Sequence, residues 1–282
     1  MPQSRPPALT PVYLRLLLDR RPQQSPAGHA VGRLESSLAG LRVDRKQVAS
    51  YQEVCGFPSS PVLPITFPHI IVAGLHMQML LGPGFPVRLT GLVHLWHRIR
   101  QFRQLRIDEH FDLSCWLEGS KTVDAGEEFC LHTELRRDGE LCWSEQTGFI
   151  SLARNRDKGL ASSRTESAVG DQLASWNAAS DIGRRYARVS ADFNPIHLST
   201  WSAKLFGFRS SIAHGMWTLA RSVAALPAGD NEDLSLEAKF LRPVYLPSTI
   251  RMFQITHGQE RRFQLTTDDT QRICVQGTFA TH

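Results

Sequence analysis

Residues 186–217 read YARVSADFNPIHLSTWSAKLFGFRSSIAHGMW, and this stretch brings one carboxylate, two histidines and a His-Gly step close together in sequence. Asp192 and His197 are separated by a short segment in which Pro195 disfavours a helical conformation for Asn194. We therefore expect a tight irregular loop in which the carboxylate and the imidazole face one cavity. Two such groups can hold one water molecule between them.

A second feature of this stretch is the expected start of a buried helix at Gly215. The apolar residues after it recur at helical spacing: Met216, Leu219, Ala220, Val223 and Ala224. A helix start offers unpaired N–H groups and the positive end of the dipole, and glycine lets a ligand approach the backbone closely. A carbonyl oxygen that gathers negative charge would be stabilised there. Beside a held water, this arrangement indicates addition of water to an activated acyl group, or its removal.

Each residue taken alone also has an ordinary structural interpretation. An aspartate in an irregular loop is usually a turn or capping residue, and a histidine before a helix often caps that helix. The Asn194-Pro195 step is common in turns. The joint pattern, rather than any single residue, favours the catalytic interpretation.

The segments SADFNPIH, SAKLFGF and IAHGM resemble the signature of the MaoC-like hydratases, the R-specific enoyl-CoA hydratases and related 3-hydroxyacyl thioester dehydratases. The resemblance implies an α+β fold of the double hotdog type, with a long antiparallel sheet wrapped around two central helices. It implies that Asp192 and His197 are the catalytic pair. By the same correspondence, Asn194 orients the water and the backbone amide of Gly215 binds the oxyanion.

Two positions depart from the commonest form of this signature. Ala191 stands where a glycine is frequent, and Ser199 stands where an aspartate or asparagine often follows the histidine. Ser199 can still cap the next helix. Neither change affects the proposed acid-base pair.

We assign substrate binding to His214, Val223, Leu226 and Arg242. Val223 and Leu226 are spaced so that both can face one side of the central helix, where an acyl tail could run. Apolar residues on a buried helix are more often plain core, and that alternative stays open. Arg242 lies in KFLRPV, a place comparable to that of Arg98 in LWHRIR.

The first half of the chain is legible as a second copy that has lost the reactive groups. YQEVCGF (51–57) aligns with YARVSAD (186–192), which places Phe57 at the position of Asp192. IVAGL (71–75) aligns with IAHGM (212–216), which places Ala73 at the position of His214. We expect a degenerate unit over residues 1–154, a linker over 155–171 and a catalytic unit over 172–282.

Alternating apolar and polar residues after each expected helix predict antiparallel strands. The Asp138-Gly139 step is a strong hairpin signal, and Asp268-Asp269 is a weaker one. The expected strands are 89–100, 109–118, 127–135 and 141–152 in the first half, and 234–241, 249–256, 262–267 and 273–281 in the second.

Composition excludes several other classes of protein. Hydrophobic residues make up 41% of the chain, and no apolar run approaches the ~20 residues that span a bilayer. The most apolar stretch, 70–81, is interrupted by His76 and Gln78 and predicts a buried helix. The five cysteines show neither CxxC nor disulfide spacing, so we expect a cytoplasmic location. Asp192, His197 and His214 could be imagined as metal ligands, but they lack a standard ligand spacing, so we expect no metal site. Residues 14–18 could begin a docking helix, although the arginine-bearing start also resembles a mitochondrial presequence.

The resulting hypothesis is a cofactor-independent hydro-lyase that interconverts trans-2-enoyl and (R)-3-hydroxyacyl thioesters. The net charge of +5 suits an anionic thioester carrier, either coenzyme A or acyl carrier protein, and no nucleic-acid module appears. Two copies of the chain could pair as a homodimer. The alternatives are a non-catalytic acyl-binding or scaffold subunit and, with less support from the DFNPIH loop, a hotdog thioesterase.

Overall fold

The computed structural model describes residues 19–22, 31–89, 92–152, 168–227 and 232–282. The expected docking helix over 14–18 lies outside these residues, and so does most of the expected linker, whose last residue, Asp171, begins a strand. No helix in the described part of the chain is long and apolar enough to cross a membrane.

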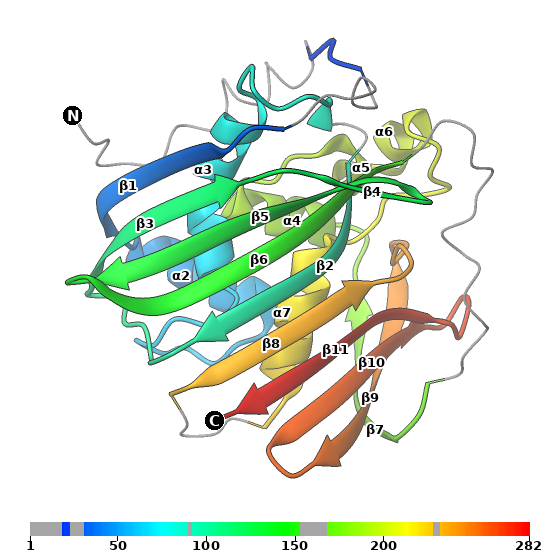
Figure 1. Cartoon of the computed structure of the whole chain (residues 1–282). Coiled ribbons are helices and arrows are strands. Elements are labelled where there is room, and N and C mark those ends of the chain that lie inside the picture. The colour runs from blue at the N-terminus through cyan, green and yellow to red at the C-terminus, as the bar shows by residue number, and fades with distance from the viewer. Residues whose placement is uncertain (1–18, 23–30, 90–91, 153–167, 228–231) are drawn as a thin grey trace.

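One antiparallel sheet of 11 strands forms the outer layer, in the order β1-β3-β5-β6-β2-β8-β11-β10-β9-β7, with β4 paired to β5 (Figure 1). The strands are β1 (Leu34–Arg42), β2 (Leu92–Gln101), β3 (His110–Leu117), β4 (Lys121–Val123), β5 (Gly126–Arg137), β6 (Glu140–Leu152), β7 (Asp171–Ala178), β8 (Leu234–Phe240), β9 (Ser248–His257), β10 (Glu260–Thr267) and β11 (Ile273–Thr281). The expected strands are confirmed to within three residues at each end.

The helices cover one face of this sheet. They are α2 (Arg45–Cys55), α3 (Pro68–Leu80), α4 (Ile182–Ser190), α5 (Pro195–Leu198), α6 (Thr200–Leu205) and α7 (Gly215–Ala225). Both α3 and α7 lie in the hollow of the curved sheet (Figure 1), as a double hotdog requires. The sequence interpretation missed β1, β4 and β7. β1 and β7 are the edge strands of the sheet. Polar residues occupy many positions on both faces of each, so neither shows a clear apolar–polar alternation.

The two halves of the sheet meet where β2 pairs with β8. β1 to β6 with α2 and α3 form the amino-terminal unit, and β7 to β11 with α4 to α7 form the carboxy-terminal unit. Hydrogen bonds show which residues correspond: the Phe102 N–H donates to the Cys142 carbonyl at 2.9 Å, and the Leu241 N–H donates to the Cys274 carbonyl at 2.8 Å. A bulge also interrupts the β5–β6 and β10–β11 pairings at the same point.

This correspondence corrects the expected equivalence of Arg98 and Arg242. Arg98 corresponds to Glu237, which is also its direct cross-strand neighbour. Arg242 follows β8 just as Arg103 follows β2, so Arg103 is its counterpart.

The expected alignment of the two helix starts is out of register. Helix α7 begins at Gly215, as expected, but Gly74 lies in the middle of α3 rather than at its start. An isolated bridge precedes each helix, formed by Val62 in the first unit and Ile212 in the second. Pro64, two residues after its bridge, therefore takes the place of His214. The two glycines therefore match in local sequence but not in structural position.

The other half of that alignment is confirmed. Helix α2 ends immediately before Gly56 (φ 76°) and α4 ends immediately before Ala191 (φ 56°), so both helices stop at a left-handed residue. Phe57 therefore does stand at the position of Asp192. The connection from there to the central helix spans 56–67 in one unit and 191–214 in the other, and only the longer one contains helices like α5 and α6.

Candidate active site

The candidate site begins where α4 turns into the long connection. The Ser190 hydroxyl donates to the Tyr186 carbonyl at 2.9 Å and accepts from the Asp192 N–H at 3.2 Å. The Asp192 carboxylate in turn accepts from the Asn194 N–H at 3.1 Å. These bonds fix the backbone on both sides of the carboxylate and leave its side chain 46% exposed.

His197 lies on the short helix α5, which Asn194 caps by accepting from the Ile196 N–H at 3.4 Å. Its Nδ1 lies 2.8 Å from the Ile212 carbonyl, which can only accept, so Nδ1 carries the proton. The Nε2 atom of this buried imidazole therefore holds the lone pair. Gly183 on α4 allows this placement, because a Cβ there would meet the His197 carbonyl oxygen at 2.0 Å.

His214 stacks on His197, with ring centroids 3.7 Å apart and planes at 27°. Its Nε2 lies 3.0 Å from the Asp192 carbonyl oxygen and 3.8 Å from the Asp192 carboxylate, so Nε2 donates to the loop backbone. The Tyr186 ring supports the other side at 4.9 Å between centroids. His214 thus holds Asp192 and His197 together.

Burial sets the charge state of these groups. It lowers the pKa of His197, and it lowers the pKa of His214 to about 3, with the neighbouring His197 adding to the effect. Partial loss of solvent around the half-exposed Asp192 carboxylate opposes its ionisation, but the His214 and His197 imidazoles and the Asn194 N–H hold its pKa below the usual range. At neutral pH the site therefore contains one carboxylate and two neutral imidazoles.

Gly215 is the first residue of α7, so helix geometry supplies no acceptor for its N–H. A Cβ at this position would meet the Phe240 ring at 3.0 Å. The glycine therefore allows the aromatic ring to pack against the helix start. The dipole of α7 adds positive potential at the same point.

The structure brings together only some of the residues assigned from the sequence. Asp192, His197 and His214 form one cluster, with Asn194 in the same loop and Gly215 following His214 directly. The remaining three lie apart from it, as follows: Val223 and Leu226 contribute to the main apolar core, and Arg242 donates to the Ile273 carbonyl at 2.7 Å. The sequence analysis expected Leu226 on the central helix, but Leu226 is the residue that ends α7.

Two groups of three residues within the described ranges have the composition and spacing of a cation site. One is Asp192, His197 and His214. The other is His69, His97 and Glu145, which the sequence interpretation missed because its members come from α3, β2 and β6. One available signal was His76 within the mostly apolar stretch 70–81, since a buried imidazole needs polar neighbours.

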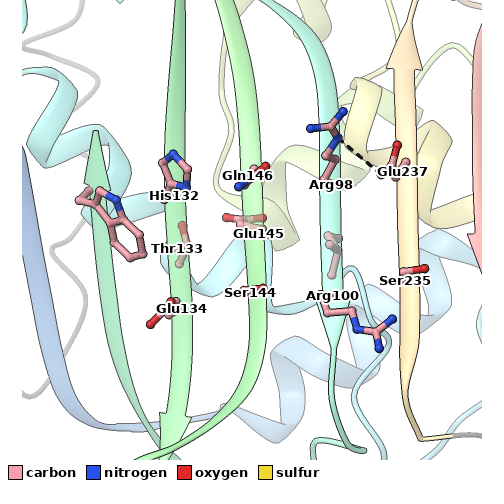
Figure 2. Close-up of a pocket in the computed structure, with 12 residues that line it drawn as sticks. Arg98, Arg100, His132, Thr133, Glu134, Ser144, Glu145, Gln146, Ser235 and Glu237 are labelled. Carbon is pink, nitrogen blue, oxygen red and sulfur yellow. Dashed lines mark ion pairs between the residues drawn. The ribbon is translucent and has the colours of Figure 1, made fainter. Parts of the chain in front are cut away.

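A separate hollow of about 420 Å³ lies on the outer face of the sheet, away from the helices (Figure 2). Arg98, Gln146 and Glu237 are among the polar residues that line it. It lies on the opposite face of the sheet from the candidate site.

A sequence profile of the MaoC like domain matches residues 169–276. This matched segment is a MaoC-like domain. The resemblance drawn from the DFNPIH and IAHGM segments is thereby confirmed. The matched range contains the whole loop and helix start that form the candidate site.

The chain is also similar to named enzymes. It is 28% identical over 215 residues to 3-hydroxyacyl-thioester dehydratase X of Mycobacterium tuberculosis, a match that covers 76% of this chain and 77% of that protein. The peroxisomal multifunctional enzyme type 2 of Drosophila melanogaster is 30% identical over 114 residues, which is 39% of this chain and 19% of that enzyme. A crystal structure of HtdX from Mycobacterium tuberculosis matches with a TM-score of 0.76 and 25% identity, over 87% of this chain and 99% of that one.

Proposed function

We propose that this MaoC-like protein reversibly hydrates trans-2-enoyl thioesters to (R)-3-hydroxyacyl thioesters. One observation carries the proposal: His197 and the Asp192 carboxylate are held together with His214, and α7 begins at Gly215, the residue after His214. Homology to a named thioester dehydratase over most of both chains supports the same class of reaction.

In the hydration direction, Asp192 and His197 hold a water molecule and accept a proton from it. The water oxygen forms a bond to C3 of the enoyl group, and the C2–C3 π electrons move toward the thioester carbonyl. The proton is then delivered to C2, so that the elements of water are added across the double bond. Neutral His197 and ionised Asp192 are the protonation states that this step needs.

The Gly215 N–H stabilises the thioester oxygen while it carries enolate charge. Asn194 helps to place the water, although its side-chain oxygen is also the cap of α5. His214 is a positioning residue, because its Nε2 donates to the Asp192 backbone and its ring supports His197. The chemistry needs no cofactor, because the thioester itself activates C2 and C3.

The direct test is to incubate the purified full chain with crotonyl-CoA and to follow loss of the enoyl absorbance. Chiral analysis of the product should give the (R)-3-hydroxy isomer, and (R)-3-hydroxybutyryl-CoA should undergo the reverse reaction. Free thiol is measured in parallel. Release of thiol without loss of the double bond would establish a thioesterase, and absence of both reactions on CoA and acyl carrier protein substrates would favour a non-catalytic binding subunit.

A further inference from the structure

We propose that the amino-terminal unit contains a binding site for a first-row divalent transition metal ion, formed by His69, His97 and Glu145. His69 lies in the first turn of α3, His97 on β2 and Glu145 on β6. Each offers one ligand atom, and the three atoms lie within 4.8 Å of one another. The His97 and Glu145 side chains are completely buried, and that of His69 is 17% exposed.

The contact between His97 and Glu145 is not a hydrogen bond. His97 Nε2 lies 3.0 Å from Glu145 Oε2, close enough for the carboxylate to act on the pKa of His97, but the contact lacks the alignment of a hydrogen bond and Nε2 has no other partner. If Nε2 carries a proton, the N–H is buried without an acceptor. If it carries a lone pair, that lone pair lies beside a carboxylate oxygen, which is repulsive. A shared cation would give His97 Nε2 a partner and would also bind Glu145 Oε2, which without the cation contacts His69 Nδ1 at 2.9 Å.

The spacing fits such a cation. Glu145 Oε2 lies 2.9 Å from His69 Nδ1, a hydrogen bond that a bound cation would replace, and 3.0 Å from His97 Nε2. An ion about 2.0 to 2.2 Å from each of two such atoms would subtend roughly 90° between them. Two imidazoles and one carboxylate on one side of an ion, with open positions opposite, are a common ligand set for first-row metals.

Neighbouring groups hold the ligands in the way that metal sites require. His97 Nδ1 lies 3.2 Å from the Thr147 hydroxyl, so the second ring nitrogen is fixed. His76 Nε2 lies 2.8 Å from the Thr133 hydroxyl and 3.7 Å from Glu145 Oε1, an oxygen that has no hydrogen-bond partner of its own. Within the described residues, the ion pairs of Glu145 involve histidines alone, with no arginine or lysine.

The carboxy-terminal unit shows that the fold does not need this cluster. The cross-strand pair Thr133 and Glu145 corresponds to the pair Phe263 and Gly277, by the same register and the same bulge. His97 corresponds to buried Leu236 by the shared hydrogen bonds after β2 and β8. A Cβ at Gly277 would meet the Phe263 ring at 2.4 Å, so an aromatic ring fills the space that polar groups occupy in the first unit.

The test uses the untagged full chain, so that no added histidines bind metal. After purification from zinc-supplemented cells and gel filtration without chelator, elemental analysis should find about one zinc ion per chain. Chelator treatment should lower the melting temperature, and added Zn²⁺ should restore it, because an ion that binds only the folded state stabilises it. Co²⁺ added to the stripped protein should produce visible ligand-field absorption.

Variants locate the ion. His97→Leu and Glu145→Gln should lose bound zinc and the cobalt absorption, while Thr147→Val should weaken metal affinity by about 10- to 100-fold. The combined variant His97→Leu, Thr133→Phe and Glu145→Gly copies the apolar arrangement of the other unit. It provides a folded, metal-free protein if a single replacement fails to fold.

Asp192→Asn is the matched control, because it removes a carboxylate from the other three-residue group and should leave zinc content unchanged. The proposal is overturned if the wild-type chain contains no stoichiometric metal and neither Zn²⁺ nor Co²⁺ changes its melting temperature or spectrum. It is also overturned if zinc persists in Glu145→Gln and is lost in Asp192→Asn. Metal content does not depend on turnover, so neither result bears on the proposed hydration.

Discussion

The two units share one fold but place their polar residues in opposite regions. In the amino-terminal unit the loop before the central helix is short and the sheet beneath it contains buried His97 and Glu145. In the carboxy-terminal unit the loop is twice as long and contains Asp192 and His197, while the buried polar residues of its described strands are two threonines, Thr266 and Thr267. The shared architecture therefore tolerates buried polar groups either in the sheet or in the loop before the central helix, and each location is specific to one unit.

The strongest test of this comparison is to remove the reactive groups from the loop that has them. Asp192→Asn and His197→Gln should each reduce hydration of crotonyl-CoA by about 100- to 10,000-fold, because each loses a proton-transfer group. Circular dichroism checks that the variants fold. Phe57→Leu changes the corresponding position of the other unit, where the ring stacks on Tyr51, and turnover should be unaffected. Normal turnover in a folded Asp192→Asn protein would contradict the assignment.

The apolar side of the comparison can be tested by stability. Phe263→Ala should reduce the free energy of unfolding by about 3 to 5 kcal/mol, since the ring is buried and covers Gly277. Urea denaturation gives the value. Arg262→Ala replaces the exposed side chain next to Phe263 in sequence and should change the free energy of unfolding by no more than about 0.5 kcal/mol. Similar losses in both variants would mean that Phe263 does not fill this part of the core.

Buried His214 should make stability depend on pH. Its pKa is about 3 in the folded chain against 6.5 when unperturbed, so below pH 6.5 the unfolded state binds a proton that the folded state does not. Stability is thus fully present above pH 6.5 and falls by about 1.4 kcal/mol per pH unit on acidification, or about 2 kcal/mol by pH 5. Urea denaturation across this range should show a shallower pH slope for His214→Gln, and an unchanged slope would rule out its buried neutral state.

The smallest effect concerns the left-handed residues that end α2 and α4. Ala191 has a φ of 56°, which disfavours a side chain, so Ala191→Gly should raise the free energy of unfolding by up to about 1 kcal/mol. Gly56→Ala should lower it, because it combines a φ of 76° with a Cβ 3.0 Å from the Arg221 guanidinium. Melting temperatures compare the two variants. A rise in the melting temperature of both variants would contradict the expected difference in backbone strain between these two positions.

The sequence predicted most of the carboxy-terminal unit, because Asp192, Pro195, His197 and Gly215 lie close together in one stretch and local rules apply to them. It also predicted the cap formed by Ser199, whose hydroxyl accepts from the Ser202 N–H at 3.1 Å. It could not align the first helix start, because Gly74 imitates Gly215 locally while the register depends on hydrogen bonds to distant strands.

The buried cluster of the first unit was missed for a related reason. His69, His97 and Glu145 are far apart in sequence, and each looks like an ordinary polar residue in its own segment. Their convergence depends on strand register, which a pattern of apolar residues constrains only to one face or the other. The functions of Val223, Leu226 and Arg242 in substrate binding stay predictions.

The ion pair between Arg98 and Glu237, drawn in Figure 2, lies where β2 of one unit pairs with β8 of the other. Arg98 and Glu237 occupy equivalent positions in the two units and are also direct neighbours across the β2–β8 pairing, with Arg98 Nε and Glu237 Oε1 3.5 Å apart. An exposed pair of this kind contributes roughly 0 to 1 kcal/mol, so it adds little to stability. Its larger effect is on which unit pairs with which. Two amino-terminal units joined through this strand would set arginine against arginine, and two carboxy-terminal units would set glutamate against glutamate, so each half prefers the other to itself.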